Sequence, residues 1–430
     1  MHAPGSDPGA CGPGSGLGRR SYDDAVAASE QSAGLRRYAD LCAAPGVARI
    51  VAAALIGRIP NGMAPLATVL LVRGEGRSYA AAGIVAAATS LATAIGWPLW
   101  GRIVDRTGQA RVLCWLAFAY PAALVALAIS ATSGAPLLVL IACAGLSGAT
   151  MAPIGACIRA LWPSLVATDG MRATAYAFEA WVQEVFFIAG PLLVALITAL
   201  AAPWVAVIAA AALACAGTAW FAFAPAVRAV PPSPHAPSRT GALASAGLRT
   251  VMLSSFAIGT AFGIVEVLMP AFAEAHGSRA NGGFALASFA FGSLLGGLWI
   301  GTRPPARQLG RRFAVLLGAL ALALTPPLVA PSLPVMCAFM LVAGLPIAAA
   351  FAASYGLVGA LAVPGTTTEA FAWLTTAIVT GLALGTSAGG AAVEHLGLTG
   401  ALALAAPCVG VAAVAAVARR ASLVIPEPVP

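Results

Sequence analysis

Residues 101–111 read Gly-Arg-Ile-Val-Asp-Arg-Thr-Gly-Gln-Ala-Arg, so that three arginines, one aspartate and two glycines are concentrated in one short stretch. No charged residue occurs in the runs on either side, 79–100 and 112–131. Each run has about the 20 residues that an α-helix needs to cross the hydrocarbon core of a bilayer. The stretch is therefore predicted to be a short polar hairpin between two membrane-spanning helices.

The composition of the whole chain agrees with a membrane protein. Hydrophobic residues make up 60% and charged residues 9% of the 430 positions, whereas about a quarter of a soluble globular protein is charged. A chain with so much apolar surface needs a lipid bilayer to cover part of it, and its length suits a bundle of a dozen helices with short loops. Its lysine-free usage, rich in alanine, arginine and glycine, is typical of a high-GC genome such as that of an actinobacterium.

Apolar length and chain breaks predict an all-α fold with twelve transmembrane helices. Their predicted ranges are 47–72, 79–100, 112–131, 135–160, 171–199, 203–224, 248–273, 282–301, 313–330, 333–361, 367–391 and 398–418. A predicted linker rich in proline and serine separates six helices from six. The predicted organisation is a disordered polar tail (1–44), an N-terminal half (45–224), a linker (225–246), a C-terminal half (247–420) and a second tail (421–430).

All 23 basic residues are arginines, and their distribution predicts the orientation of the chain. If the N-terminal tail is cytoplasmic, nineteen arginines, Arg159 among them, lie in inner segments and only Arg73, Arg77 and Arg279 in outer loops. Under the positive-inside rule both termini are then cytoplasmic, as in a multi-pass protein of a prokaryotic plasma membrane. The net charge of +8 is spread over alternate loops rather than gathered in one patch, so nucleic acid is not an expected partner.

The two predicted halves share a glycine pattern at an offset of 200 residues. Gly83, Gly96 and Gly101 recur as Gly283, Gly296 and Gly301. In addition, the opening stretch resembles the G-x-x-x-D-R-x-G-[RK]-[RK] loop of the major facilitator superfamily of secondary transporters. The chain keeps Gly101, Asp105, Arg106 and Gly108 of that loop. Gln109 stands in place of the first basic residue, and the second basic residue is displaced to Arg111.

The resemblance covers about residues 45 to 420 and implies two pseudo-symmetric six-helix halves that work by alternating access. It also implies that Gly101, Asp105, Arg106, Gly108 and Arg111 form a gating motif. In the superfamily the motif aspartate lies near the amino end of the eleventh span when the cytoplasmic side is closed. Here that segment is Gly365 to Thr368, where the helix dipole favours a carboxylate.

Four ionisable residues lie in the interior of predicted spans, away from the ends of the ranges, namely Arg58, Glu179, Glu184 and Glu266. Each is unfavourable in a membrane unless it is paired, neutralised or hydrated, so each is a candidate for the substrate or proton pathway. The resemblance places the helices that carry them around a central cavity. Asn61 lies one turn after Arg58 on the same helix face and is a further candidate.

Glu179 and Glu184 are five positions apart and point about 140° away from each other, so they belong to different sites. For Glu179 the alternatives are an ion pair that locks its helix to the first or eighth span, or a place in the pathway. Glu184 precedes Phe186 and Phe187, and apolar surroundings favour the protonated form of a carboxyl group, which suits a proton carrier. Glu266 is the second candidate carrier.

Two further residues leave alternatives open. Arg58 either neutralises one of the glutamates or binds an anionic substrate directly. Thr366 and Glu369, three positions apart, are typical of a capping box in which Glu369 reaches back to Thr366. The alternative for Glu369 is a gate contact at the cytoplasmic face.

The sequence contains no catalytic constellation, no nucleotide-binding loop and no cysteine pair with metal-ligand spacing, so neither an enzyme, a metal site nor a cofactor is predicted. Gly190-Pro191 resembles a motif of proton-driven exporters, although the glycines that usually follow it are absent. The predicted function is secondary transport, with proton-coupled export of a small, partly apolar molecule by a monomer. The alternatives are uptake of a small metabolite and a non-transporting membrane sensor or assembly partner.

Overall fold

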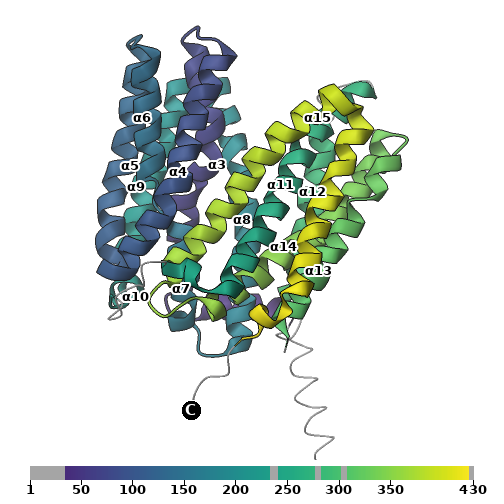
Figure 1. Cartoon of the computed structure of the whole chain (residues 1–430). Coiled ribbons are helices and arrows are strands. Elements are labelled where there is room, and N and C mark those ends of the chain that lie inside the picture. The colour runs from purple at the N-terminus through teal and green to yellow at the C-terminus, as the bar shows by residue number, and fades with distance from the viewer. Residues whose placement is uncertain (1–33, 233–240, 277–281, 302–307, 426–430) are drawn as a thin grey trace, which may run out of the picture.

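The computed structural model describes residues 34–232, 241–276, 282–301 and 308–425 (Figure 1). Most of the predicted N-terminal tail, the centre of the predicted linker and the end of the C-terminal tail lie outside the described residues. Arg239, Arg279, Arg303 and Arg307 also lie outside them. The described segments fold into helices, with no strand among them.

The first half begins with a short helix and continues with the first six spans. Its helices are α2 (Gly34–Ala43), α3 (Val47–Gly74), α4 (Tyr79–Thr107), α5 (Gln109–Thr132), α6 (Leu137–Thr150), α7 (Ile154–Leu165), α8 (Asp169–Leu200) and α9 (Pro203–Phe223). The predicted fourth span is interrupted at residues 151–153 because Pro153 cannot continue a helix, and α6 and α7 together form it.

The second half follows the short helix α10 (Pro225–Arg228) and the 3-10 turn η1 (Gly241–Ala244). Its helices are α11 (Ala246–Ala275), α12 (Gly282–Gly301), α13 (Leu309–Ala323), α14 (Leu333–Leu361) and α15 (Thr367–Ala418), with the 3-10 turns η3 (Pro326–Val329) and η4 (Arg420–Leu423). Eleven described helical stretches are long and apolar enough to cross a membrane. Helix α15 is two helices joined at Gly397, whose φ of 71° is non-helical, and separating them gives the twelve predicted spans.

The polar stretch 101–111 is more helical than the predicted hairpin. Helix α4 continues to Thr107 and α5 begins at Gln109, so that Gly108 alone separates them. Gly108 has a φ of +91°, which only glycine adopts readily, and a single residue can therefore make the turn. Most of the motif consequently projects from the last turns of α4.

Large apolar side chains are exposed along the outside of the described bundle. Examples are Leu91, Phe118, Leu138, Leu200, Leu322 and Val411. A monomeric soluble protein rarely exposes apolar side chains along so many helices, because water would surround them. In a bilayer, lipid tails cover such side chains. The described chain therefore has the surface of a multi-pass membrane protein.

Within each half, close helix pairs meet at glycines. The pairs with the most extensive contact are α11 with α15, α12 with α14, α3 with α9 and α4 with α6. A Cβ at Gly381 or Gly385 of α15 would overlap the carbonyl oxygens of Phe256 and Thr260 in α11. These glycines let the two backbones touch, which is how helices pack in a membrane.

The two halves lie side by side, converge at the end that carries α7 and α10, and separate toward the opposite end (Figure 1). The helices that connect the halves are α4 with α15, α7 with α15, and α8 with α12 and α14. The converged end is called the closed end below. The polar residues of interest lie where these helices meet.

Candidate functional site

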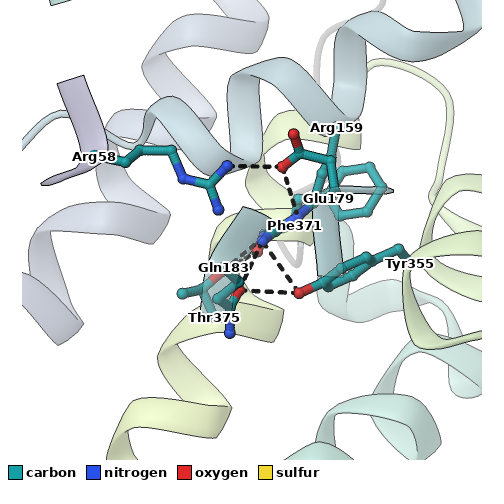
Figure 2. Close-up of polar contacts among 7 residues, drawn as sticks. All are labelled: Arg58, Arg159, Glu179, Gln183, Tyr355, Phe371 and Thr375. Carbon is teal, nitrogen blue, oxygen red and sulfur yellow. Dashed lines mark hydrogen bonds and ion pairs between the residues drawn. The ribbon is translucent and has the colours of Figure 1, made fainter. Parts of the chain in front are cut away.

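A buried ion cluster joins three helices of the first half. Nη1 of Arg58 on α3 donates to Oε2 of Glu179 on α8 at 2.8 Å, and Nε of Arg159 on α7 lies 3.9 Å from the same oxygen (Figure 2). The exposed fractions of these side chains are 3%, 1% and 2%. The ion pair between the fifth and first spans, one of the two alternatives for Glu179, is therefore present in the fold.

Arg159 connects this cluster to the second half. Its Nη2 donates to Oε1 of Gln183 at 3.0 Å and to the hydroxyl of Tyr355 on α14 at 3.2 Å. The Tyr355 hydroxyl in turn donates to Oε1 of Gln183 at 3.0 Å, and Nη1 of Arg159 lies 3.4 Å from Oγ1 of Thr375 on α15 (Figure 2). Residues from both halves thus surround one guanidinium group.

The position of Arg159 corrects the sequence-based prediction, which assigned it to a cytoplasmic segment. The interruption at Pro153 starts a new helix, and Arg159 lies inside that helix and is almost completely buried. The sequence does contain a signal of this burial, because Arg159 is a single arginine within the apolar run of Ile158, Ala160, Leu161 and Trp162. An isolated charge in such a run is as unfavourable as those at the four positions that were recognised.

Glu184 lies at a different contact between the halves. Its Oε1 accepts a hydrogen bond of 3.1 Å from Oγ of Ser293 on α12, and it forms no ion pair with any described residue. Glu179 and Glu184 therefore face different helices, as their spacing predicts. Glu266 on α11 is exposed, and the described residues include no ion-pair partner for it. Asn61 is half-buried and makes no hydrogen bond within the described ranges.

A second polar contact between the halves lies at the closed end. Oδ1 of Asp105 accepts from the backbone N–H of Thr368 at 3.1 Å, and Oδ2 accepts from that of Glu369 at 2.9 Å. These N–H groups lie in the first turn of α15, where a helix has no internal acceptor for them. Asp105 of α4 therefore caps a helix of the other half, close to the segment that the family resemblance implies.

The predicted capping box between Thr366 and Glu369 is wrong. Oγ1 of Thr366 donates to the carbonyl of Val363 at 2.8 Å and makes no cap bond to the helix. Glu369, which is buried, accepts instead from Nη2 and Nε of Arg102 on α4, at 2.8 and 3.2 Å. Glu369 thus contacts the other half at the closed end, and its role as a gate contact stays a prediction.

The remaining motif positions divide into packing and exposed residues. A Cβ on Gly101 would lie 2.8 Å from the Cα of Glu369, so a glycine there permits the approach of α4 to α15. Gln109, which stands at the first basic position, is buried and donates to the carbonyl of Cys157 at 3.2 Å. Arg106 and Arg111 are exposed and form no ion pair within the described segments.

Helix α2 packs across the two halves at the closed end. The Tyr38 hydroxyl donates to the carbonyl of Gly297 on α12 at 3.2 Å, and its ring lies 6.2 Å from that of Phe178 on α8. Burial raises the pKa of Tyr38 to about 12, so this hydroxyl keeps its proton at neutral pH. The closed end is thus held by α2, by the Asp105 cap and by the Arg102–Glu369 pair.

Comparisons with known proteins agree with this architecture. The profile of the Major Facilitator Superfamily matches residues 50–302. No curated protein has significant sequence similarity to the chain. Among solved structures, a bacterial homologue of the iron transporter ferroportin in the outward-facing state is similar with a TM-score of 0.72 at 15% identity, over 87% of this chain and 99% of that one.

Two other transporters of known structure have the same fold. The human organic anion transporter MFSD10 has a TM-score of 0.69 at 17% identity, over 86% of this chain and 99% of that one. The fucose:proton symporter of E. coli has a TM-score of 0.65 at 11% identity, over 86% and 98%. The profile match spans more than half of the sequence, and the family consists of transporters, not enzymes. The chain is therefore a multi-pass membrane protein that belongs to the Major Facilitator Superfamily of secondary transporters.

Proposed function

We propose that the protein is a proton-coupled secondary transporter that exports a small, partly apolar molecule by alternating access. The observation that carries the coupling is the contact between Glu184 on α8 and Ser293 on α12. It joins the two halves, and among the described residues the partner of its carboxyl group is a hydroxyl and not a cation. Protonation changes such a contact because an ionised carboxylate only accepts hydrogen bonds, whereas the acid also donates.

The proposed direction of transport rests on a single sequence motif. Export is favoured by the resemblance of Gly190-Pro191 to the exporter motif, and in the fold Gly190 packs directly against Gly62 of α3. Uptake of a small metabolite is the second candidate. The similar structures are those of a homologue of an iron transporter, an organic anion transporter and a fucose:proton symporter, so the fold is compatible with very different cargoes.

The proposal predicts the behaviour of Glu184→Gln. This side chain cannot release a proton, so a pH gradient should no longer drive net transport, whereas exchange of labelled for unlabelled substrate should continue. Metabolites in cells and medium would first be compared between strains that lack and overproduce the chain. The identified compound would then be followed in proteoliposomes with and without a pH gradient.

Ser293→Ala is the matched control for Glu184→Gln. It removes the same hydrogen bond but keeps the carboxyl group that binds and releases the proton, so a pH gradient should still drive transport, although less effectively than in the unaltered protein. Undiminished gradient-driven transport by Glu184→Gln would exclude Glu184 as the carrier. If overproduction moved no solute at all, the non-transporting sensor or assembly partner would become the better description.

The orientation of the chain is part of the proposal. The arginine bias places both termini, and with them the closed end, in the cytoplasm. A reporter enzyme active only outside the plasma membrane should therefore be silent when fused after Pro430. The same reporter inserted at Gly134, in the turn between α5 and α6, should be active; the reverse pattern would contradict the orientation.

A further inference from the structure

The ion cluster around Glu179 holds more positive than negative charge. Arg58 and Arg159 both approach Oε2 of Glu179, and all three side chains are almost completely buried. Within the described residues neither arginine has a second carboxylate within ion-pair distance. Because arginine stays protonated in proteins, the cluster carries one uncompensated positive charge in a place from which water is largely excluded.

The hydrogen bonds of Arg159 show which group carries the excess. Its Nε is buried and has no hydrogen-bond acceptor, since the nearest carboxylate oxygen lies 3.9 Å away. Its Nη1 has only the long 3.4 Å contact with Thr375, and its Nη2 is bonded to the neutral side chains of Gln183 and Tyr355. An anion would supply both the missing charge and the missing acceptor.

The surroundings of the cluster are aromatic. The ring of Tyr355 lies 4.1 Å from Cζ of Arg159, and that of Phe186 lies 4.8 Å from Cζ of Arg58. The ring of Tyr176 lies 6.5 Å from that of Tyr355 and 6.0 Å from that of Phe371. These rings suit an apolar body attached to the charged group of a ligand.

The location of the cluster fits a transported ligand better than a permanent lock. Arg159 belongs to the first half, whereas Tyr355 and Thr375 belong to α14 and α15 of the second half. Any movement that separates the halves at this level breaks these contacts and exposes the guanidinium group. A lock between α3 and α8 needs only Arg58 and Glu179, so it does not explain why a second arginine is buried beside them.

We propose that this cluster binds the negatively charged group of a small organic anion with an apolar body, such as a monocarboxylate, and that Arg159 is its anchor. The inference rests on the proposed transport function, because it names the substrate class of the same protein. It adds a ligand charge that neither the fold nor the family membership specifies.

The test measures binding by the purified full-length protein in detergent, without transport. Its thermal unfolding midpoint would be followed while short-chain, medium-chain and aromatic monocarboxylates are titrated, each beside its neutral amide and the corresponding amine. Ligands that bind the folded state raise the midpoint with concentration. We expect carboxylates to raise it and the amides and amines to leave it unchanged.

Variants locate the effect. Arg159→Gln leaves the neutral Arg58–Glu179 pair and should fold, but its affinity for the carboxylates should fall about ten- to a hundredfold, as expected for the loss of a charged hydrogen-bond donor. Arg159→Lys keeps the charge and should retain part of the affinity and the preference for carboxylates over amides. Arg49→Gln removes an exposed arginine from α3 and should bind as the unaltered protein does.

The outcomes separate this inference from the proposed transport function. Failure of every carboxylate to stabilise the protein, equal stabilisation by the amides, or full affinity in Arg159→Gln would overturn the anion site, even if a neutral solute is transported. Carboxylate binding that depends on Arg159, without movement of any solute in proteoliposomes, would support the site and overturn the transport function.

Discussion

Replacing Glu179 with glutamine should lower the free energy of unfolding by about 3–5 kcal/mol, the range measured when one partner of a buried ion pair is removed. The reason is that, within the described parts of the chain, Glu179 is the carboxylate that both buried arginines share, so Arg58 and Arg159 each lose their counter-ion. The measurement is the unfolding transition of the purified variant in mixed micelles, compared with the unaltered protein.

Two further variants make this result specific. Glu394→Gln removes an exposed carboxylate that has no ion-pair partner in the described chain, and it should unfold as the unaltered protein does. The double variant Arg58→Gln/Glu179→Gln leaves one arginine without a counter-ion instead of two and should recover part of the lost stability. An unchanged transition in Glu179→Gln would show that the charges of the cluster are compensated in another way.

Asp105→Asn should shift the balance between conformations more than it lowers stability. The substitution removes the charge and one of two acceptors at the first turn of α15, in a contact between the halves at the closed end that we expect to break when this end opens. Charge at a helix terminus and charged hydrogen bonds are each worth about 2 kcal/mol in partly buried positions, which corresponds to roughly a thirtyfold change in the ratio of two conformers.

Distance measurements between spin labels test this shift. Labels at Arg111 and Arg420, both exposed, would report the separation of the halves in a background without native cysteines. Asp105→Asn should populate a longer distance, and Arg106→Gln, an exposed motif position without a charged partner, should not. A distance distribution unaffected by Asp105→Asn would mean that the cap does not hold the closed end.

Most of the fold is predictable because lipid imposes a simple rule on sequence. A helix that crosses a bilayer needs a long run without charge, and the runs 79–100 and 112–131 satisfy it without reference to any distant residue. The breaks are predictable where proline or glycine acts locally. The ends of helices inside polar stretches are harder to predict. The sequence predicted a hairpin over residues 101–111, whereas in the structure Gly108 alone makes the turn.

The polar site is predictable only where the cause is local. The contact between Asp105 and the start of α15 was inferred from a family resemblance, since nothing near Asp105 in sequence specifies a partner more than 260 positions away. The capping box failed for the same reason. Thr366 and Glu369 have the right spacing, but two residues of another helix take the places of their mutual bonds. The carboxylate of Asp105 accepts from the backbone N–H of Glu369, and the guanidinium group of Arg102 pairs with the Glu369 carboxylate.

The turn at Gly397 bears on how the chain enters the membrane. The two arms of α15 are joined without a loop, and residues 370 to 418 contain one acidic residue, Glu394, one histidine, His395, and no arginine or lysine. No polar segment between the arms has to be carried across the bilayer on its own, so the last two spans are expected to leave the translocon together as one helical hairpin. These two spans would then insert as a pair, in a single step that follows the emergence of the second arm of α15 from the ribosome.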